Sequence, residues 1–70
     1  MLKINELIEN TNGYTYKIIE QKLNYAIVER QGNVEYVVAY DLKKYEDKYS
    51  WSRGQYFINL DDAKRCLNNK

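Results

Sequence analysis

The sequence is poor in the side chains on which most metal and catalytic sites depend. Its 70 residues include one cysteine, Cys66, and no histidine. One thiol excludes a disulfide within the chain, and it also excludes a zinc site built from cysteine and histidine. Such sparse cysteine usage is typical of a reducing compartment, so we expect the protein to be cytoplasmic.

A long apolar run and an excess of charge of one sign are also missing. No apolar segment approaches the length of a membrane span, and the first residues lack the apolar stretch of a secretory signal. Eleven basic and ten acidic residues give a net charge of +1. We therefore expect no membrane association, and no binding to duplex nucleic acid that depends mainly on phosphate contacts.

Catalytic motifs are absent as well. Without histidine, acid–base chemistry would depend on carboxylates, lysine or tyrosine, and the carboxylates here stand at an expected helix start or beside basic residues. The sequence contains no glycine-rich phosphate loop, GxSxG motif or EF-hand spacing. Cys66 falls late in an expected helix with no basic partner, which favours a packing role. We predict a non-enzymatic protein that needs no cofactor or metal.

The sequence does contain eight tyrosines and a strong hairpin signal. Two runs rich in Val, Ile and Tyr, 24–31 and 34–41, flank Gly32-Asn33, a pair typical of a two-residue type II′ turn. This turn predicts a register that joins Arg with Glu, aliphatic with aliphatic and Tyr with Tyr. The predicted pairs are Gln31–Val34, Arg30–Glu35, Val28–Val37, Ile27–Val38, Ala26–Ala39 and Tyr25–Tyr40.

Alternation along these two strands separates two faces of the sheet. One face is small and smooth, which favours close packing of a helix. The other is aromatic, and it is either a second core layer or a recognition surface. The smooth face carries Ala26, Val28, Val37 and Ala39, and the aromatic face carries Tyr25, Ile27, Tyr36, Val38 and Tyr40.

The segments before the hairpin predict a helix and a strand. Apolar residues at helical spacing predict a short helix over residues 2–10 that ends near Gly13. Residues 14–20 alternate and are predicted to form the first strand of an antiparallel three-stranded meander, with 24–31 as its middle strand. The apolar positions of the predicted helix are Leu2, Ile4, Leu7 and Ile8.

After the hairpin, residues 42–54 break the alternation and are predicted to form a long connection. Residues 55–58 are predicted to return as a fourth strand at the edge, and residues 49–52 either pair with it or extend the third strand. Asn59 is a favourable N-cap for a last helix with two aspartates in its first turn. Its buried stripe is predicted to contain Leu60, Ala63 and Leu67, with Cys66 at the margin.

These elements predict a single α+β domain over residues 1–70. It would consist of a short N-terminal helix, an antiparallel meander sheet of three to four strands and a C-terminal helix. A chain this short has one small core, which lies near the lower limit of independent stability.

Aromatic and basic residues of the sheet face and of the 43–53 loop are the candidate partner-binding residues, because interface energy concentrates in Tyr, Trp and Arg. The loop either contacts single-stranded nucleic acid or packs its aromatics on the sheet, and the acidic pair Glu46-Asp47 favours the second. Trp51 is predicted near the loop tip, as an anchor whose removal leaves the fold intact. The candidates are Tyr25, Tyr36, Tyr40, Lys43, Lys44, Tyr45, Tyr49, Trp51 and Arg53.

Several short stretches carry a resemblance to a known family over roughly the first forty residues. They are Ile4-Asn5-Glu6-Leu7-Ile8, Tyr14-Thr15, Lys17-Ile18, Gly32-Asn33 and Glu35-Tyr36-Val37. In these the chain resembles small phage-encoded anti-CRISPR proteins that inhibit type II effector nucleases. The resemblance implies an N-terminal helix, a three-stranded meander, C-terminal helical structure and binding where the nuclease reads its target DNA. Charge mimicry of DNA is not implied, because the DNA-mimicking members are strongly acidic and this chain is near neutral.

A second resemblance concerns the C-terminal half. The chain is similar there to small uncharacterised proteins of bacterial mobile elements, at Trp51, Gly54, Tyr56-Phe57, Leu60 and Ala63. Together the two resemblances imply a phage or mobile-element protein that binds and blocks a bacterial defence nuclease, or its guide complex, in the host cytoplasm. It would act as a monomer or homodimer. The alternative is a nucleic-acid-binding accessory module that uses the sheet face and the basic, aromatic loop.

Overall fold

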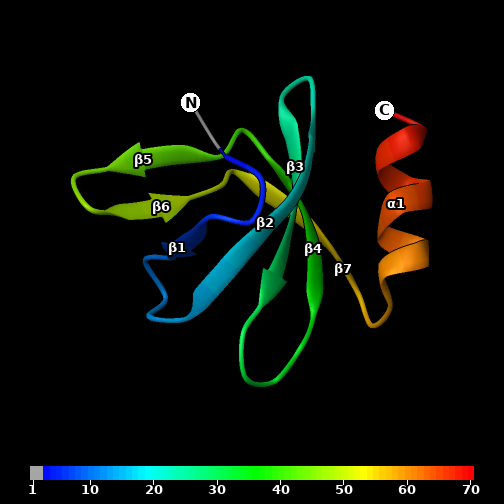
Figure 1. Ribbon diagram of the computed structural model, residues 1–70. Coiled ribbons are helices and arrows are strands. Elements are labelled where there is room, and N and C mark those ends of the chain that lie inside the picture. The colour runs from blue at the N-terminus through cyan, green and yellow to red at the C-terminus, as the bar shows by residue number, and fades with distance from the viewer. Residues whose placement is uncertain (1–2) are drawn as a thin grey trace.

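Antiparallel strands dominate the computed structural model, which describes residues 3–70 (Figure 1). The elements are β1 (Leu7–Glu9), β2 (Thr15–Lys22), β3 (Tyr25–Arg30), β4 (Tyr36–Tyr40), β5 (Lys43–Tyr45), β6 (Lys48–Ser50), β7 (Arg53–Phe57) and α1 (Leu60–Asn68). Five strands form one sheet in the order β1-β2-β3-β4-β7, and β5 pairs with β6 in a second sheet. The prediction of three to four strands is therefore wrong, although the combination of an antiparallel sheet with a C-terminal helix is confirmed.

The N-terminal helix predicted for residues 2–10 is also wrong. Residue 2 lies outside the described residues, and Leu7–Glu9 form β1, which pairs antiparallel with β2. Exposure alternates as in a strand, with Ile8 3% exposed and Leu7 59% exposed. Asn5 has φ of 72°, outside the helical region, and its amide donates to the carbonyl of Ile18 at 2.6 Å. A two-turn helix is only marginally stable in water. A strand at this position instead forms hydrogen bonds with backbone groups along the free edge of the eight-residue β2.

The predicted register of the central hairpin is confirmed from Tyr25–Tyr40 to Arg30–Glu35, whereas the predicted pair Gln31–Val34 is not formed among the described residues. Tyr25 lies opposite Tyr40, and the pairing continues without a shift to Val28 and Val37. The amide of Arg30 donates to the carbonyl of Glu35 at 2.8 Å, and the two side chains form an ion pair at 3.6 Å. The alternation of small, aliphatic and aromatic positions thus selected the pairing correctly.

The predicted two-residue turn is not formed. The last backbone bond between β3 and β4 joins Arg30 to Glu35, so the connection spans residues 31–34. The amide of Gln31 points away from β4 and donates to the carbonyl of Thr15 at 2.9 Å. Gly32 does adopt the positive φ expected of it, 88°.

The helix covers the aromatic face of the sheet, whereas close packing had been predicted on the smooth face. Ala63 and Leu67 pack with Ile27 and Val38 in one buried cluster. The register explains this, because Ile27 lies opposite Val38 and the tyrosines occupy the rows at either end. The helix sits on this aliphatic centre, and Tyr25 and Tyr36 pack against it from its two ends. Both faces are therefore buried at their centres.

The smooth face is covered by the segment predicted as an irregular connection. Residues 43–50 form the β5–β6 hairpin, which turns at Glu46 with φ of 58°. Leu42, Tyr49 and Trp51 pack against a buried cluster on this face. The buried members of that cluster are Ile8, Tyr16, Ile18, Val28, Val37 and Ala39.

The hairpin is held to β1 by polar contacts. The carbonyl of Tyr49 accepts from the Asn10 side chain at 2.8 Å and from the Thr11 amide at 3.1 Å. Lys48 pairs with Glu9 at 3.0 Å, and the pKa of Lys48 is raised, first through the hydrogen bond with this carboxylate. The outer edge of β1 is thereby occupied by the hairpin.

The C-terminal elements follow the prediction. The strand predicted over residues 55–58 is β7, at Arg53–Phe57, and it lies at the sheet edge beside β4. The two alternatives predicted for residues 49–52 are wrong, because Lys48–Ser50 form β6 and pair with β5. Asn59 caps α1, accepting from the Asp62 amide at 2.9 Å, and Ala63 and Leu67 are buried. Within residues 3–70, the structure contains no helix long and apolar enough to cross a membrane.

Candidate binding surface

A row of cations and tyrosines crosses the helix-bearing face of the sheet. Lys22 lies opposite Tyr25, Tyr25 opposite Tyr40, and Tyr40 opposite Arg53, so the four side chains stand on four neighbouring strands. We call these four residues the tyrosine row. At the strand spacing of a sheet it spans about 14 Å.

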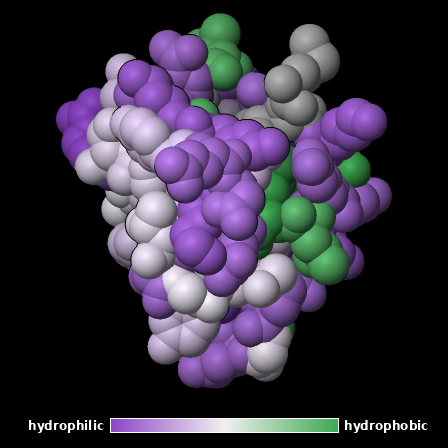
Figure 2. Space-filling view, turned by 90° about the vertical axis from the view of Figure 1, so that its left-hand side faces the viewer, coloured by the Kyte–Doolittle hydropathy of each residue, from purple (hydrophilic) through white to green (hydrophobic). Residues whose placement is uncertain are grey.

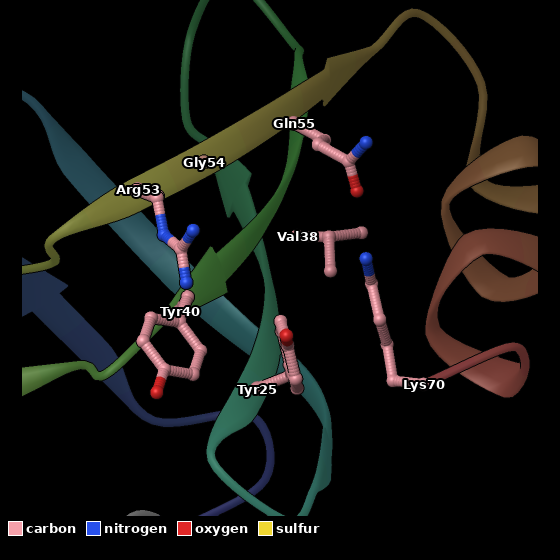
Figure 3. A pocket seen from close by; sticks show the side chains of 7 residues that line it. All are labelled: Tyr25, Val38, Tyr40, Arg53, Gly54, Gln55 and Lys70. Atoms are coloured by element: carbon pink, nitrogen blue, oxygen red, sulfur yellow. The ribbon is translucent and has the colours of Figure 1, made fainter.

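The two tyrosines of the row lie side by side, and each is close to a cation (Figure 3). The rings of Tyr25 and Tyr40 are 5.0 Å apart at their centres and tilted by 50°. The guanidinium of Arg53 lies 4.7 Å from the centre of the Tyr40 ring, and the ammonium of Lys70 lies 5.0 Å from that of Tyr25. Each tyrosine is therefore paired with a cation at a distance typical of cation–π contact.

An open cleft of about 470 Å³ lies between this row and the end of α1. Figure 3 shows Arg53 entering it from β7 and Lys70 from the residues after the helix. The ammonium of Lys22 donates to the carbonyl of Asn68 at 3.0 Å, which ties the sheet to the helix end. The cleft is lined by Tyr25, Val38, Tyr40, Arg53, Gly54, Gln55 and Lys70.

Of the nine candidate residues, the structure brings three together in this cleft: Tyr25, Tyr40 and Arg53. Lys22 and Lys70 were not predicted. If a two-residue turn at Leu23-Asn24 had been assumed, counting residues outward from it would have placed Lys22 opposite Tyr25. Leu23, however, adopts φ of 56°, which leucine rarely does, so the sequence carries no signal for this turn. Lys70 is brought in by the path of α1 across the sheet.

Tyr36 lies at the opposite end of β4 and belongs to a different environment. It packs beside the buried cluster under α1, and its pKa is raised, first by a hydrogen bond with Glu29 and then by burial. The Glu29 carboxylate also accepts from the Gln31 side chain at 3.1 Å. Tyr25 packs against the same cluster from the other end, but Tyr36 lies outside the lining of the cleft.

Ionisation of Tyr36 is expected to destabilise the protein at high pH. A raised pKa in the folded state gives stability that is complete below the unfolded value of 10.0 and is lost as pH rises through the folded pKa. The thermal midpoint should fall as pH is raised from neutral to above about 10, and Tyr36→Phe should reduce this fall. Circular dichroism of both proteins across this range tests it, with the exposed Tyr56→Phe as control. An equal reduction in both variants would contradict the assignment to Tyr36.

The remaining candidates lie on or beside the β5–β6 hairpin. Lys43 pairs with Asp41 at 3.5 Å, and the ammonium of Lys44 lies 5.9 Å from the centre of the Tyr49 ring. Tyr45 is 61% exposed. Figure 2 faces this side of the molecule and shows a mainly hydrophilic surface with small hydrophobic areas. The hairpin therefore offers polar and single aromatic contacts, without a broad apolar patch.

Trp51 does not stand at the tip of the connection. The tip is Glu46-Asp47, between β5 and β6, whereas Trp51 follows β6 and packs on the smooth face. Its ring meets that of Tyr16 edge-on, with centres 5.2 Å apart. Gly54 provides the space: a Cβ atom there would lie 3.2 Å from Nε1 of Trp51 and 2.9 Å from Cγ1 of Val37. The prediction that Trp51 lies near the tip of the connection is therefore wrong.

Cys66 lies beside the buried cluster under α1, and its thiol donates to the Gln55 side-chain oxygen at 2.9 Å. Among residues 3–70, no group of three or more His, Cys, Asp or Glu residues is placed to hold a metal ion. Comparisons with protein families, curated proteins and solved structures give no match to this chain.

Proposed function

We propose that the protein acts by binding another protein, without chemistry of its own, and that its main contact is the tyrosine row with the adjoining cleft. The partner that we propose is a bacterial defence nuclease or its guide complex, which the bound protein blocks. The choice of partner is supported by the sequence resemblance of the first forty or so residues to anti-CRISPR inhibitors. The implied N-terminal helix is not part of this support, because β1 occupies that segment.

The observation that carries the binding role is the tyrosine row itself. Tyrosine and arginine are the residues in which interface energy concentrates. Here they stand side by side on neighbouring strands, at the end of the sheet face beside the last residues of α1, where Tyr25 also packs against the cluster under the helix. A rigid aromatic group loses little conformational entropy when a partner binds.

Capture from a bacterial lysate tests this proposal. The wild-type protein should retain a nuclease after the lysate is treated with DNase and RNase, and should inhibit cleavage by that nuclease. Tyr40→Ala should weaken capture by roughly tenfold or more, since truncating one anchor commonly costs about 2 kcal/mol. Tyr45→Ala, on the exposed hairpin, is the matched control and should bind normally. If Tyr40→Ala is folded by circular dichroism yet captures as well as wild type, the row is not the contact.

A nucleic-acid-binding accessory module is the second candidate. It is favoured by the repeated pairing of a cation with a tyrosine ring, at Arg53 with Tyr40 and at Lys44 with Tyr49. Such pairs recur where proteins hold single strands. Binding to DNA or RNA alone, weakening steeply as salt is raised, would support this function over the first.

A further inference from the structure

Two cations, Arg53 and Lys70, converge on the cleft. Within residues 3–70, neither Arg53 nor Lys70 forms an ion pair with a carboxylate. Both are instead positioned by tyrosine rings, at 4.7 Å and 5.0 Å. A ring face attracts a cation without using up its N–H donors in conventional hydrogen bonds. The cleft therefore presents a guanidinium and an ammonium ready to bind an anion.

The carboxylate side chains beside the tyrosine row are engaged or lie outside the cleft lining. Asp41 pairs with Lys43 at 3.5 Å and accepts from the Ser52 hydroxyl at 3.4 Å. Glu20 stands opposite Ile27, one row away from the tyrosine row and outside the cleft lining. At the C-terminal end of α1, the carbonyl of Asn68 accepts from Lys22. Among the described residues that line the cleft, the charged side chains are therefore those of Arg53 and Lys70.

The ring geometry discriminates between kinds of anionic ligand. A nucleobase binds such a surface by stacking on an aromatic face. In this cleft Arg53 and Lys70 already lie over the rings, and the two rings are tilted toward each other by 50°. A carboxylate needs no ring face, and it matches the planar fork of a guanidinium with two parallel hydrogen bonds.

From these observations we infer that the cleft is a carboxylate-binding site and that its ligand is an acidic segment of the protein partner. This inference rests on the proposed function for the nature of the partner. Arg53 binds the carboxylate through its guanidinium, and Lys70 contributes a second charge from the opposite wall. Tyr25 and Tyr40 hold the two cations apart and in place.

Titration with a hexaglutamate peptide, followed by NMR, tests the site without any nuclease. The peptide should shift resonances of Tyr25, Tyr40, Arg53 and Gln55. Arg53→Gln/Lys70→Gln should weaken binding on the order of tenfold or more, since hydrogen bonds between charged groups are the strong class. Lys43→Gln/Lys44→Gln removes the same net charge and should leave the affinity unchanged within about twofold.

Two outcomes would overturn the assignment. Equal weakening in both double variants would show general attraction to a basic surface. Tighter binding of oligothymidylate than of hexaglutamate, at the same residues, would identify the ligand as nucleic acid. A hexaglutamine peptide controls for backbone contacts and should produce no shifts.

The nuclease assay separates this inference from the proposed function. If hexaglutamate binds as expected but no nuclease is captured, the proposed function fails and the carboxylate site stands. If Arg53→Gln/Lys70→Gln loses the peptide but captures and inhibits the nuclease at wild-type affinity, the partner's acidic segment does not occupy the cleft. In that case the proposed function stands and the inference fails.

Discussion

Replacing Leu67 with alanine is expected to lower the free energy of unfolding by about 2–4 kcal/mol, the usual range for a buried leucine. The side chain is fully buried, with 0% exposed, and packs with Ile27 and Val38 where α1 crosses the sheet. Small domains have a total stability of only about 5 kcal/mol, so the variant should approach unfolding at room temperature. Urea denaturation followed by circular dichroism measures the change.

The control is Leu7→Ala, which makes the same truncation on the exposed side of β1. Its stability should change by no more than about 0.5 kcal/mol. A Leu67→Ala protein with an unchanged urea midpoint would show that the helix is not docked through this residue.

Replacing Trp51 with alanine is expected to destabilise the protein by about 2–3 kcal/mol. This lies below the usual range for a fully buried tryptophan, because part of the ring is in solvent. The ring contacts Tyr16 edge-on and covers Gly54, so its loss opens the smooth face of the sheet. The expectation from sequence was the opposite, a folded variant that has lost only its partner.

Trp51→Phe separates packing from recognition. Phenylalanine keeps an aromatic ring against Tyr16 and should recover at least half of the lost stability. Thermal unfolding of both variants, followed by circular dichroism, measures the difference. If Trp51→Ala unfolds at the wild-type midpoint, the ring does not contribute to the core.

Tyr25, Tyr40 and Arg53 of the candidate surface were among the residues predicted from sequence, and for the two tyrosines the reason lies in the hairpin. Tyr25 was correctly placed opposite Tyr40 because alternation over two adjacent strands leaves one register that buries the aliphatic residues together. The shared face of the two tyrosines followed from the same argument. Lys22 and Lys70 could not be found in this way, because one depends on a turn at an unfavourable leucine and the other on the path of the helix.

A bulge in β2 is a second feature that no local pattern indicates. The register shifts between Ile18 and Glu20, so Ile18 lies opposite Val28 while Glu20 lies opposite Ile27. The extra residue, Ile19, packs beside the cluster under α1, whereas Ile18 is buried in the cluster on the other face. Two consecutive isoleucines therefore pack on opposite faces of the sheet. A regular strand would also place them on opposite faces, but without the bulge Lys22 would not lie opposite Tyr25.

The sequence by itself determined the register of β3 and β4, the edge position of β7 and the cap and buried stripe of α1. The register and the helix cap depend on neighbours close along the chain: strands joined by a short turn, or a helix start with its own first turn. Only the tertiary structure decided that residues 7–9 form a strand, that the helix covers the aromatic face, and that Trp51 is packed on the core. These depend on which backbone edge and which apolar face remain uncovered once the sheet has formed. The helical spacing of apolar residues over two turns stabilises a helix too little to compete with strand pairing at that edge.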